Sequence, residues 1–324
     1  MASLKEIKGR IASVSGTLKI TSAMKLVASA KLRKAQLAIT NMLPYQRQLQ
    51  LILSRLMAEG AEEHAAGDAS VPRPYSAAAE REWTRPGTGG ATATSVAIVA
   101  FSSNSSLCGA FNSNAIRQTL SVIDEYRSAG FADENIIVYS VGRKIAEAMR
   151  KAGFPSPEDY SKMAESPGYE AASALAKELI EGHLSGRFVK VELVYNHFKS
   201  TSSQPTVRET YLSATNSPGQ QTADYQSQPG QPLSVATQAF CDDIIVEPSR
   251  EAVLGVLLPK VLRLKIYATL LDSNAAEHAA RTVAMQTATD NGNDLLEELT
   301  LEYNKGRQQK ITSEILDIVG GSLR

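Results

Sequence analysis

The sequence predicts an α/β protein with a long antiparallel coiled coil, in which the N- and C-terminal helices form a shaft and a central Rossmann-like domain forms a foot. Three observations lead to this fold class. Apolar residues in 1–57 repeat at intervals of three and four, as in a coiled coil, and those near the end of 249–324 do the same. Between them, residues 95–248 alternate short apolar runs with helical stretches, which is typical of layered α/β structure. No apolar run reaches about 18 residues, the length of a membrane span.

The first segment, residues 1–57, is expected to form one long helix that needs a partner helix. Its apolar seam extends over eight heptads, and thirteen of the sixteen seam positions are apolar. Three or four such heptads already indicate a coiled coil. The seam positions are Leu4, Ile7, Ile11, Val14, Leu18, Thr21, Lys25, Ala28, Leu32, Ala35, Ile39, Met42, Gln46, Leu49, Leu53 and Leu56.

Two features interrupt this helix. Thr21 and Lys25 place polar groups on the seam beside an alternative apolar stripe, so we expect the face that meets the partner to rotate there. Pro44 removes an amide donor inside the pattern, which predicts a kink or break near Met42. The alternative stripe consists of Ile20, Met24 and Val27.

Residues 58–94 differ in composition from the helix before them. Ala, Gly, Glu and Pro predominate, with prolines and glycines scattered throughout, which predicts a flexible insertion or linker. Trp83, the only tryptophan of the chain, is expected to tack this segment down.

Residues 95–248 predict the globular α/β domain. The first apolar run is typical of a buried parallel strand, and a turn of small residues and a helix follow it. Residues 214–234 are rich in Gln, Ser, Thr, Pro and Gly, and therefore predict a floppy loop. The expected strands are 95–101, 135–140, 189–195 and 206–212, and the expected helices are 112–128, a helix between Gly142 and Gly153, and 169–184.

Residues 249–324 are expected to form the second shaft helix, with Ser249 as its N-cap. Only Pro259, near its beginning, and isolated glycines interrupt the pattern as far as Ile318. At about 1.5 Å per residue, the two terminal segments would span roughly 85 and 110 Å. Two helices of this length that flank a compact domain should pair antiparallel and leave both chain ends at the far tip of the shaft.

The formal net charge of the chain is +0, but the charges are unevenly distributed. Residues 1–57 hold ten basic residues and one acid, residues 249–324 hold nine and ten, and the remaining middle is acidic. A basic helix of this kind suits a negative partner, which could be nucleic acid, a membrane surface or an acidic protein wall. Its cluster of Lys31, Arg33 and Lys34 is as compatible with a solvated face as with an acidic partner.

No set of residues in the sequence assembles a catalytic centre, so we expect a non-catalytic protein without cofactor or metal. The turn 102–112 follows a strand, where α/β folds place phosphate loops, but the chain has neither Gly-x-x-x-x-Gly-Lys-Ser/Thr nor Gly-x-Gly-x-x-Gly. We expect it to be a tight turn that packs Leu107, Cys108 and Phe111 into the domain. Two cysteines suit a reducing compartment. The four histidines, expected at the surface or core edge, are His64, His183, His197 and His278.

The terminal segments and the turn resemble the gamma subunits, or central rotor stalks, of F-type ATP synthases. The resemblance rests on the stretches 7–14 and 19–28, on Leu-Cys-Gly-Ala-Phe-Asn at 107–112, and on 284–291 and 303–315, and it covers about three-quarters of the chain. The sequence departs from the family at Asn104-Ser105-Ser106, where the family usually has Asp-Arg-Gly. Residues 58–94 and 214–234 look like insertions.

This resemblance implies that the coiled coil inserts into a ring of alternating alpha and beta subunits. The foot would sit with the epsilon subunit on the membrane-embedded c-ring, so that proton flow turns the shaft and drives the catalytic sites through their states. The chain would be peripheral to the membrane and attached to it only through the complex, on the cytoplasmic face in bacteria or the matrix or stroma side in organelles. Positions that match the family's coupling residues, or lie beside them, are Met24, Lys25, Arg281, Arg307, Gln308 and Thr312.

Two other classes of protein are compatible with parts of the pattern. A nucleic-acid-binding coiled coil would explain the basic helix, but Tyr45 is the only aromatic residue in 1–57 that could stack on a base. An α/β enzyme with a coiled-coil dimerisation element would need a phosphate loop or a catalytic base. The polar set at 303–312 favours a second partner outside the helix pair, because hydrogen-bonding side chains there would weaken the seam of a plain coiled coil.

Overall fold

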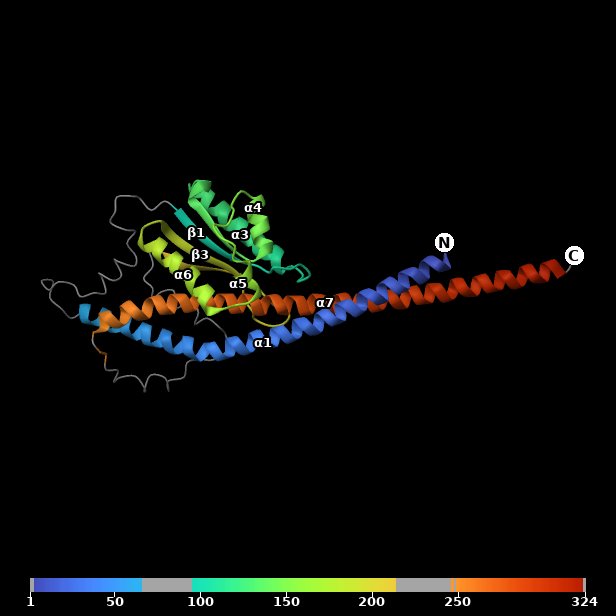
Figure 1. Ribbon diagram of the computed structural model, residues 1–324, viewed down its shortest axis with the longest axis horizontal. Coiled ribbons are helices and arrows are strands. Elements are labelled where there is room, and N and C mark those ends of the chain that lie inside the picture. The colour runs from blue at the N-terminus through green and yellow to red at the C-terminus, as the bar shows by residue number, and fades with distance from the viewer. Residues whose placement is uncertain (1–2, 66–94, 214–245, 248, 323–324) are drawn as a thin grey trace.

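The computed structural model describes residues 3–65, 95–213, 246–247 and 249–322 of the chain (Figure 1). The expected loop 214–234, most of the expected linker 58–94, Trp83 and Cys241 lie outside these residues. The elements are α1 (Leu4–Ala65), β1 (Ser95–Phe101), α3 (Phe111–Ser128), η1 (Asp133–Asn135), β2 (Ile136–Val141), α4 (Arg143–Lys151), α5 (Ser161–Glu165), α6 (Tyr169–Leu184), β3 (Phe188–Asn196), β4 (Thr206–Ser213) and α7 (Arg250–Ser322).

The shaft is the antiparallel pair of α1 and α7, with both ends of the chain at the end far from the sheet (Figure 1). None of the sixteen predicted seam positions of α1 is exposed, and those near the foot, from Ala28 to Ala35 and from Gln46 to Leu56, include most of the fully buried ones. The heptad pattern therefore identified the contact face of α1 correctly. Burial of this apolar seam is the main source of stability for a helix of such length.

The predicted rotation of the contact face is wrong. Ile20 and Val27 of the alternative stripe are 62% and 58% exposed, whereas Thr21 and Lys25 stay half-buried on the seam. The polar position is tolerated because the Thr289 hydroxyl of α7 lies 3.1 Å from the Thr21 hydroxyl, which itself reaches the Leu18 carbonyl. The chain is also not broken near Met42, because α1 continues as one helix through Pro44.

Helix α7 is longer than its partner and extends beyond it (Figure 1). Leu4, the first residue of α1, packs against Gly306, where an added Cβ would lie 3.1 Å from the Leu4 Cδ2 atom. We call residues 307–322 the overhang of α7. The apolar repeat continues along the overhang with no described helix opposite it, and its large apolar side chains are 48–72% exposed: Ile311, Ile315, Leu316, Ile318 and Val319.

The foot contains a four-stranded sheet in the order β2-β1-β3-β4, which confirms all four predicted strands. β1 pairs in parallel with β2 and β3, and β4 is antiparallel to β3 at the edge. Successive residues of β1 point to opposite faces: Val96 and Ile98 pack with α3 and α4, whereas Ala97 and Val99 pack with α6 and α7. The sheet is therefore a layer between one pair of helices and the shaft.

The middle of α7 is buried on two sides at once. Its small residues Ala275, Ala276 and Ala279 are completely inaccessible to solvent. Ala275 and Ala279 pack against Leu32 and Ala35 of α1, while Ala276 packs against Cys108 and Phe111 of the foot. Alanines at these positions let both neighbours approach the α7 backbone closely, and this region is the joint between shaft and foot.

Gly142 connects β2 to α4, and a substitution there measures how tightly this part of the foot is packed. Its φ angle is +109°, and an added Cβ would lie 2.3 Å from the Ser102 carbonyl oxygen, which is backbone and cannot move away cheaply. Gly130 has a similar φ of +94° but no atom within 4 Å of such a Cβ. Gly130→Ala should therefore lower the free energy of unfolding by about 1–3 kcal/mol through backbone strain alone.

Gly142→Ala should cost distinctly more than Gly130→Ala, because the clash adds to the strain. Urea unfolding of the two variants and the wild type measures both losses. Equal losses would mean that the Ser102 turn moves freely and that the foot is not tightly packed there.

Candidate functional site

The six residues that the sequence singles out fall into three different environments along the shaft. Met24 and Lys25 are half-buried on α1, next to Thr21 and its contact with α7. Arg281 is only 8% exposed in the middle of α7. Arg307, Gln308 and Thr312 are exposed on the overhang. The structure therefore does not bring the six together into one site.

Arg281 connects the shaft to the foot. Its guanidinium donates from Nη1 to Glu277 Oε1 at 2.6 Å and from Nη2 to Ser105 Oγ at 2.7 Å. Glu277 lies one turn earlier on α7, whereas Ser105 belongs to the turn 102–112 of the foot. Ser105 is one of the residues that departs from the family pattern, and here its neutral hydroxyl accepts a charge-assisted hydrogen bond from Arg281.

The turn that carries Ser105 is held in place by its own side chains and by α4. Asn112 Oδ1 accepts from the Ser103 amide at 3.0 Å, and Asn104 Oδ1 accepts from the Arg143 amide at 2.9 Å. Cys108 is 1% exposed, as expected for a residue that packs into the domain. The same expectation for Leu107 is wrong, because this residue is 57% exposed and has a left-handed φ of 67°.

The charges around Arg281 are unusual for a buried position. Burial raises the pKa of Glu277, although Arg281 opposes this shift. Burial, together with the nearby charges of Arg281 and Lys31, lowers the pKa of His278 to about 4, so His278 is neutral at pH 7. Among the described residues, His278 Nδ1 has no hydrogen-bond partner. The arrangement connects two elements through hydrogen bonds, and among the described residues around Arg281 no nucleophile contacts a base.

A second polar contact fixes the loop between β3 and β4 to α7. Asp272 of α7 accepts from the Phe198 amide at 2.9 Å, and its other oxygen lies 2.6 Å from His197 Nδ1. This hydrogen bond raises the pKa of His197. Sequence reasoning placed His197 at the surface or the core edge and missed its partner, because the two residues lie 75 positions apart and no local pattern connects them.

Within the described part of the chain, no group of three or more His, Cys, Asp and Glu residues could hold a metal ion. The same residues contain no helix that combines the length and the apolar character of a membrane span.

Comparisons with known proteins give one consistent result. The family model described as ATP synthase matches residues 3–323. The ATP synthase gamma chain of Phocaeicola vulgatus is 51% identical over 323 residues, covering 100% of both chains. That of Flavobacterium johnsoniae is 38% identical over 322 residues, covering 99% of this chain and 98% of the other.

Two solved structures have the same fold. A chain of the Euglena gracilis mitochondrial ATP synthase rotor, in rotational state 1, aligns with a TM-score of 0.57 at 17% identity, covering 95% of this chain and 98% of that one. A chain of the OSCP/F1/c-ring assembly of the same organism, in rotational state 3, aligns with a TM-score of 0.59 at 17% identity, covering 99% and 93%.

Removing the Arg281 side chain should show how much the joint depends on it. Arg281→Leu leaves Glu277 buried without its counter-charge, and we expect a loss of about 3–5 kcal/mol in the free energy of unfolding. Ser105→Ala removes only one acceptor and should cost about 1–3 kcal/mol. Urea unfolding of each variant gives both values.

The double variant Glu277→Gln, Arg281→Leu is the control for this explanation. Because it removes the uncompensated carboxylate together with the guanidinium, it should be more stable than Arg281→Leu alone. If the loss of stability in the double variant equals the sum of the losses in Arg281→Leu and Glu277→Gln measured singly, the two side chains are not coupled in the folded protein.

The contact of His197 with Asp272 predicts a pH dependence of stability. The folded-state pKa of His197 lies above its unfolded value, so its contribution is fully present below about pH 6.5 and is lost as the pH rises through the folded pKa. The stability difference between the wild type and His197→Gln should therefore shrink with rising pH in that window. The unfolding free energy of both proteins, measured across it, tests this expectation.

Asp272→Asn is the matched control, because the amide can still accept from the Phe198 backbone but carries no charge. A difference between wild type and His197→Gln that stays constant with pH would rule out the ion pair. His278 does not interfere, since its lowered pKa makes stability fall only as the pH drops from about 6.5 toward 4.

Proposed function

We propose a set of partners for this chain, which belongs to the ATP synthase gamma-chain family and serves as the central-stalk rotor subunit of that enzyme. The alpha and beta subunits would surround the shaft, and the epsilon subunit and c-ring would lie at the foot. Proton flow through the c-ring would turn the foot, and the shaft would carry the rotation into the ring of alpha and beta subunits. Identity with gamma chains over the full length supports this assignment.

The overhang of α7 is the structural observation that carries the proposed arrangement of partners. Its apolar side chains have no partner helix within the described chain, although they continue the repeat that pairs α7 with α1. Exposed apolar groups of this kind mark an interaction surface. Insertion of the overhang into the centre of the alpha and beta ring would cover them.

The six residues have two different roles in this proposal. Arg307, Gln308 and Thr312 are exposed on the overhang, so their polar groups can contact the surrounding subunits. Met24 and Lys25 lie on the outer half of the α1 seam, where a half-buried side chain can still touch a ring subunit. Arg281 is directed into the joint, and we propose that it transmits load between shaft and foot through Ser105.

We also propose that the chain is non-catalytic and is attached to the membrane only through the complex. Its sequence has no phosphate loop, and the hydrogen-bond contacts of the buried Cys108 within the described chain are to Ser103, Ser105 and Asn112, none of which is a histidine base. The location on the cytoplasmic face of the cell membrane is proposed from the bacterial relatives.

Nothing in the structure favours the nucleic-acid alternative. Tyr45, the one aromatic residue of 1–57, has the Lys260 ammonium of α7 6.0 Å from its ring centroid. A single aromatic side chain that already contacts a cation is a poor platform for stacking bases.

The proposal is tested by Met24→Lys in the assembled complex. The change adds a cation beside Lys25 on a face that we place near the ring, where it would form a wrong contact. A tagged chain, expressed with the other subunits, should recover alpha and beta subunits in both wild-type and variant form. ATP-driven proton pumping in membrane vesicles should be strongly reduced in the variant only.

Met24→Leu is the control, because it keeps the volume and the apolar character and should pump normally. Normal pumping by Met24→Lys would contradict the role of this residue. Failure of the tagged wild-type chain to recover alpha and beta subunits would contradict the proposed partners themselves.

A further inference from the structure

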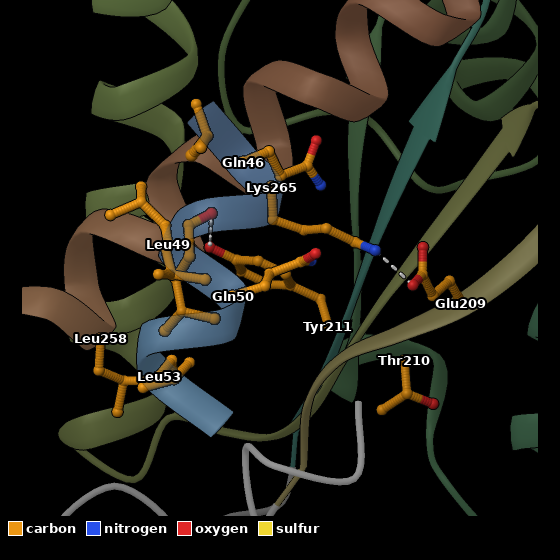
Figure 2. Close-up of a pocket in the computed structure, with 12 residues that line it drawn as sticks. Gln46, Leu49, Gln50, Leu53, Glu209, Thr210, Tyr211, Leu258 and Lys265 are labelled. Atoms are coloured by element: carbon orange, nitrogen blue, oxygen red, sulfur yellow. Dashed lines mark hydrogen bonds and ion pairs between the residues drawn. The ribbon is translucent and has the colours of Figure 1, made fainter. Parts of the chain in front are cut away.

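A small cavity lies where α1, α7 and β4 meet. Its volume is about 40 Å³. Figure 2 shows side chains of all three elements around it, with Lys265 of α7 reaching across to Glu209 of β4. Most of the wall is apolar and buried, and consists of Leu49, Leu53, Tyr211, Leu258, Leu262 and Leu264.

Gln46 is the one amide on the α1 seam, and it lines this cavity. The residue is 4% exposed, and its Oε1 atom has no hydrogen-bond partner among the described residues. Leaving a buried carbonyl oxygen dry costs free energy comparable to that of a lost hydrogen bond, and such atoms are rare in folded proteins. The position therefore requires a donor that the described side chains do not supply.

The volume of the cavity determines which kind of molecule could supply the missing hydrogen-bond donor. A void of this kind needs roughly 10–15 Å³ to hold one water molecule, and an apolar cavity that admits benzene is about 150 Å³. This cavity is large enough for water and too small for an organic ligand. A buried water also needs two to four polar partners. Besides Gln46, the polar residues of the wall are Gln50, Thr210 and the ion pair of Lys265 with Glu209.

We propose that the cavity is a binding site for ordered water, in which a water molecule donates a hydrogen bond to Gln46 Oε1 and makes its other hydrogen bonds to polar groups of the same wall. The water connects the shaft to the edge strand of the foot. It also explains why an amide occupies a seam position among leucines, because a single buried polar residue in a coiled coil fixes the register of the helices at one point.

The test is a density map of the assembled complex at a resolution that shows ordered water. We expect a peak inside the cavity about 2.5–3.0 Å from Gln46 Oε1. In Gln46→Met, which has a similar length and no acceptor, this peak should be absent. Gln48→Met makes the same change at an exposed position of the same helix, and it should leave the peak in place.

An empty cavity in the wild-type map, or one filled by a neighbouring side chain, would overturn the proposal. So would a peak that persists unchanged in Gln46→Met, since the water would then not depend on this residue. The wild-type map decides even if Gln46→Met does not assemble. A failure of this test is distinguishable from a failure of the proposed function, because the water is read from the density map and the function from proton pumping.

Discussion

The structure depends on one packing constraint, which is that the middle of α7 must be buried against α1 and against the foot at the same time. The constraint explains the composition of this stretch, where Ala275, Ala276 and Ala279 leave room for neighbours on both sides. A larger side chain at Ala275 or Ala279 would push α1 away from α7, and one at Ala276 would push the foot away. The same helix is thus both half of the shaft and part of the core of the foot, so the two cannot rotate independently without exposing this core.

Polar contacts add direction to this apolar joint. Hydrophobic burial holds α7 near the foot but does not fix its rotation, whereas the hydrogen bonds of Asp272 to the Phe198 amide and of Arg281 to Ser105 do. The cost of burying the charges of Asp272 and Arg281 is offset because each forms a hydrogen bond with a residue of the foot. A subunit that transmits torque needs directional contacts of this kind where its shaft meets its foot.

The sequence was sufficient to predict the elements that depend on local periodicity. The seam of α1 follows from apolar residues at intervals of three and four, and the four strands follow from short apolar runs that alternate with helical stretches; both are found as predicted. The rotation predicted at Thr21 failed because a partner hydroxyl, from Thr289, makes a polar seam position acceptable. The contacts of Arg281 and Asp272 were also out of reach, since they connect residues far apart in the chain, and only the fold brings them together.

The overhang shows that the isolated chain is an incomplete structure. Beyond Gly306, α7 has no neighbour within the described chain, and a helix of about 12–15 residues is marginally stable in water by itself. Exposure of its apolar side chains to water, as at Ile311 and Ile318, does not stabilise the helix. The heptad pattern here is a requirement that the chain cannot satisfy alone. In the proposed assembly, a surrounding ring of subunits would satisfy it, and a contact made all around the helix would permit rotation where a single partner helix would prevent it.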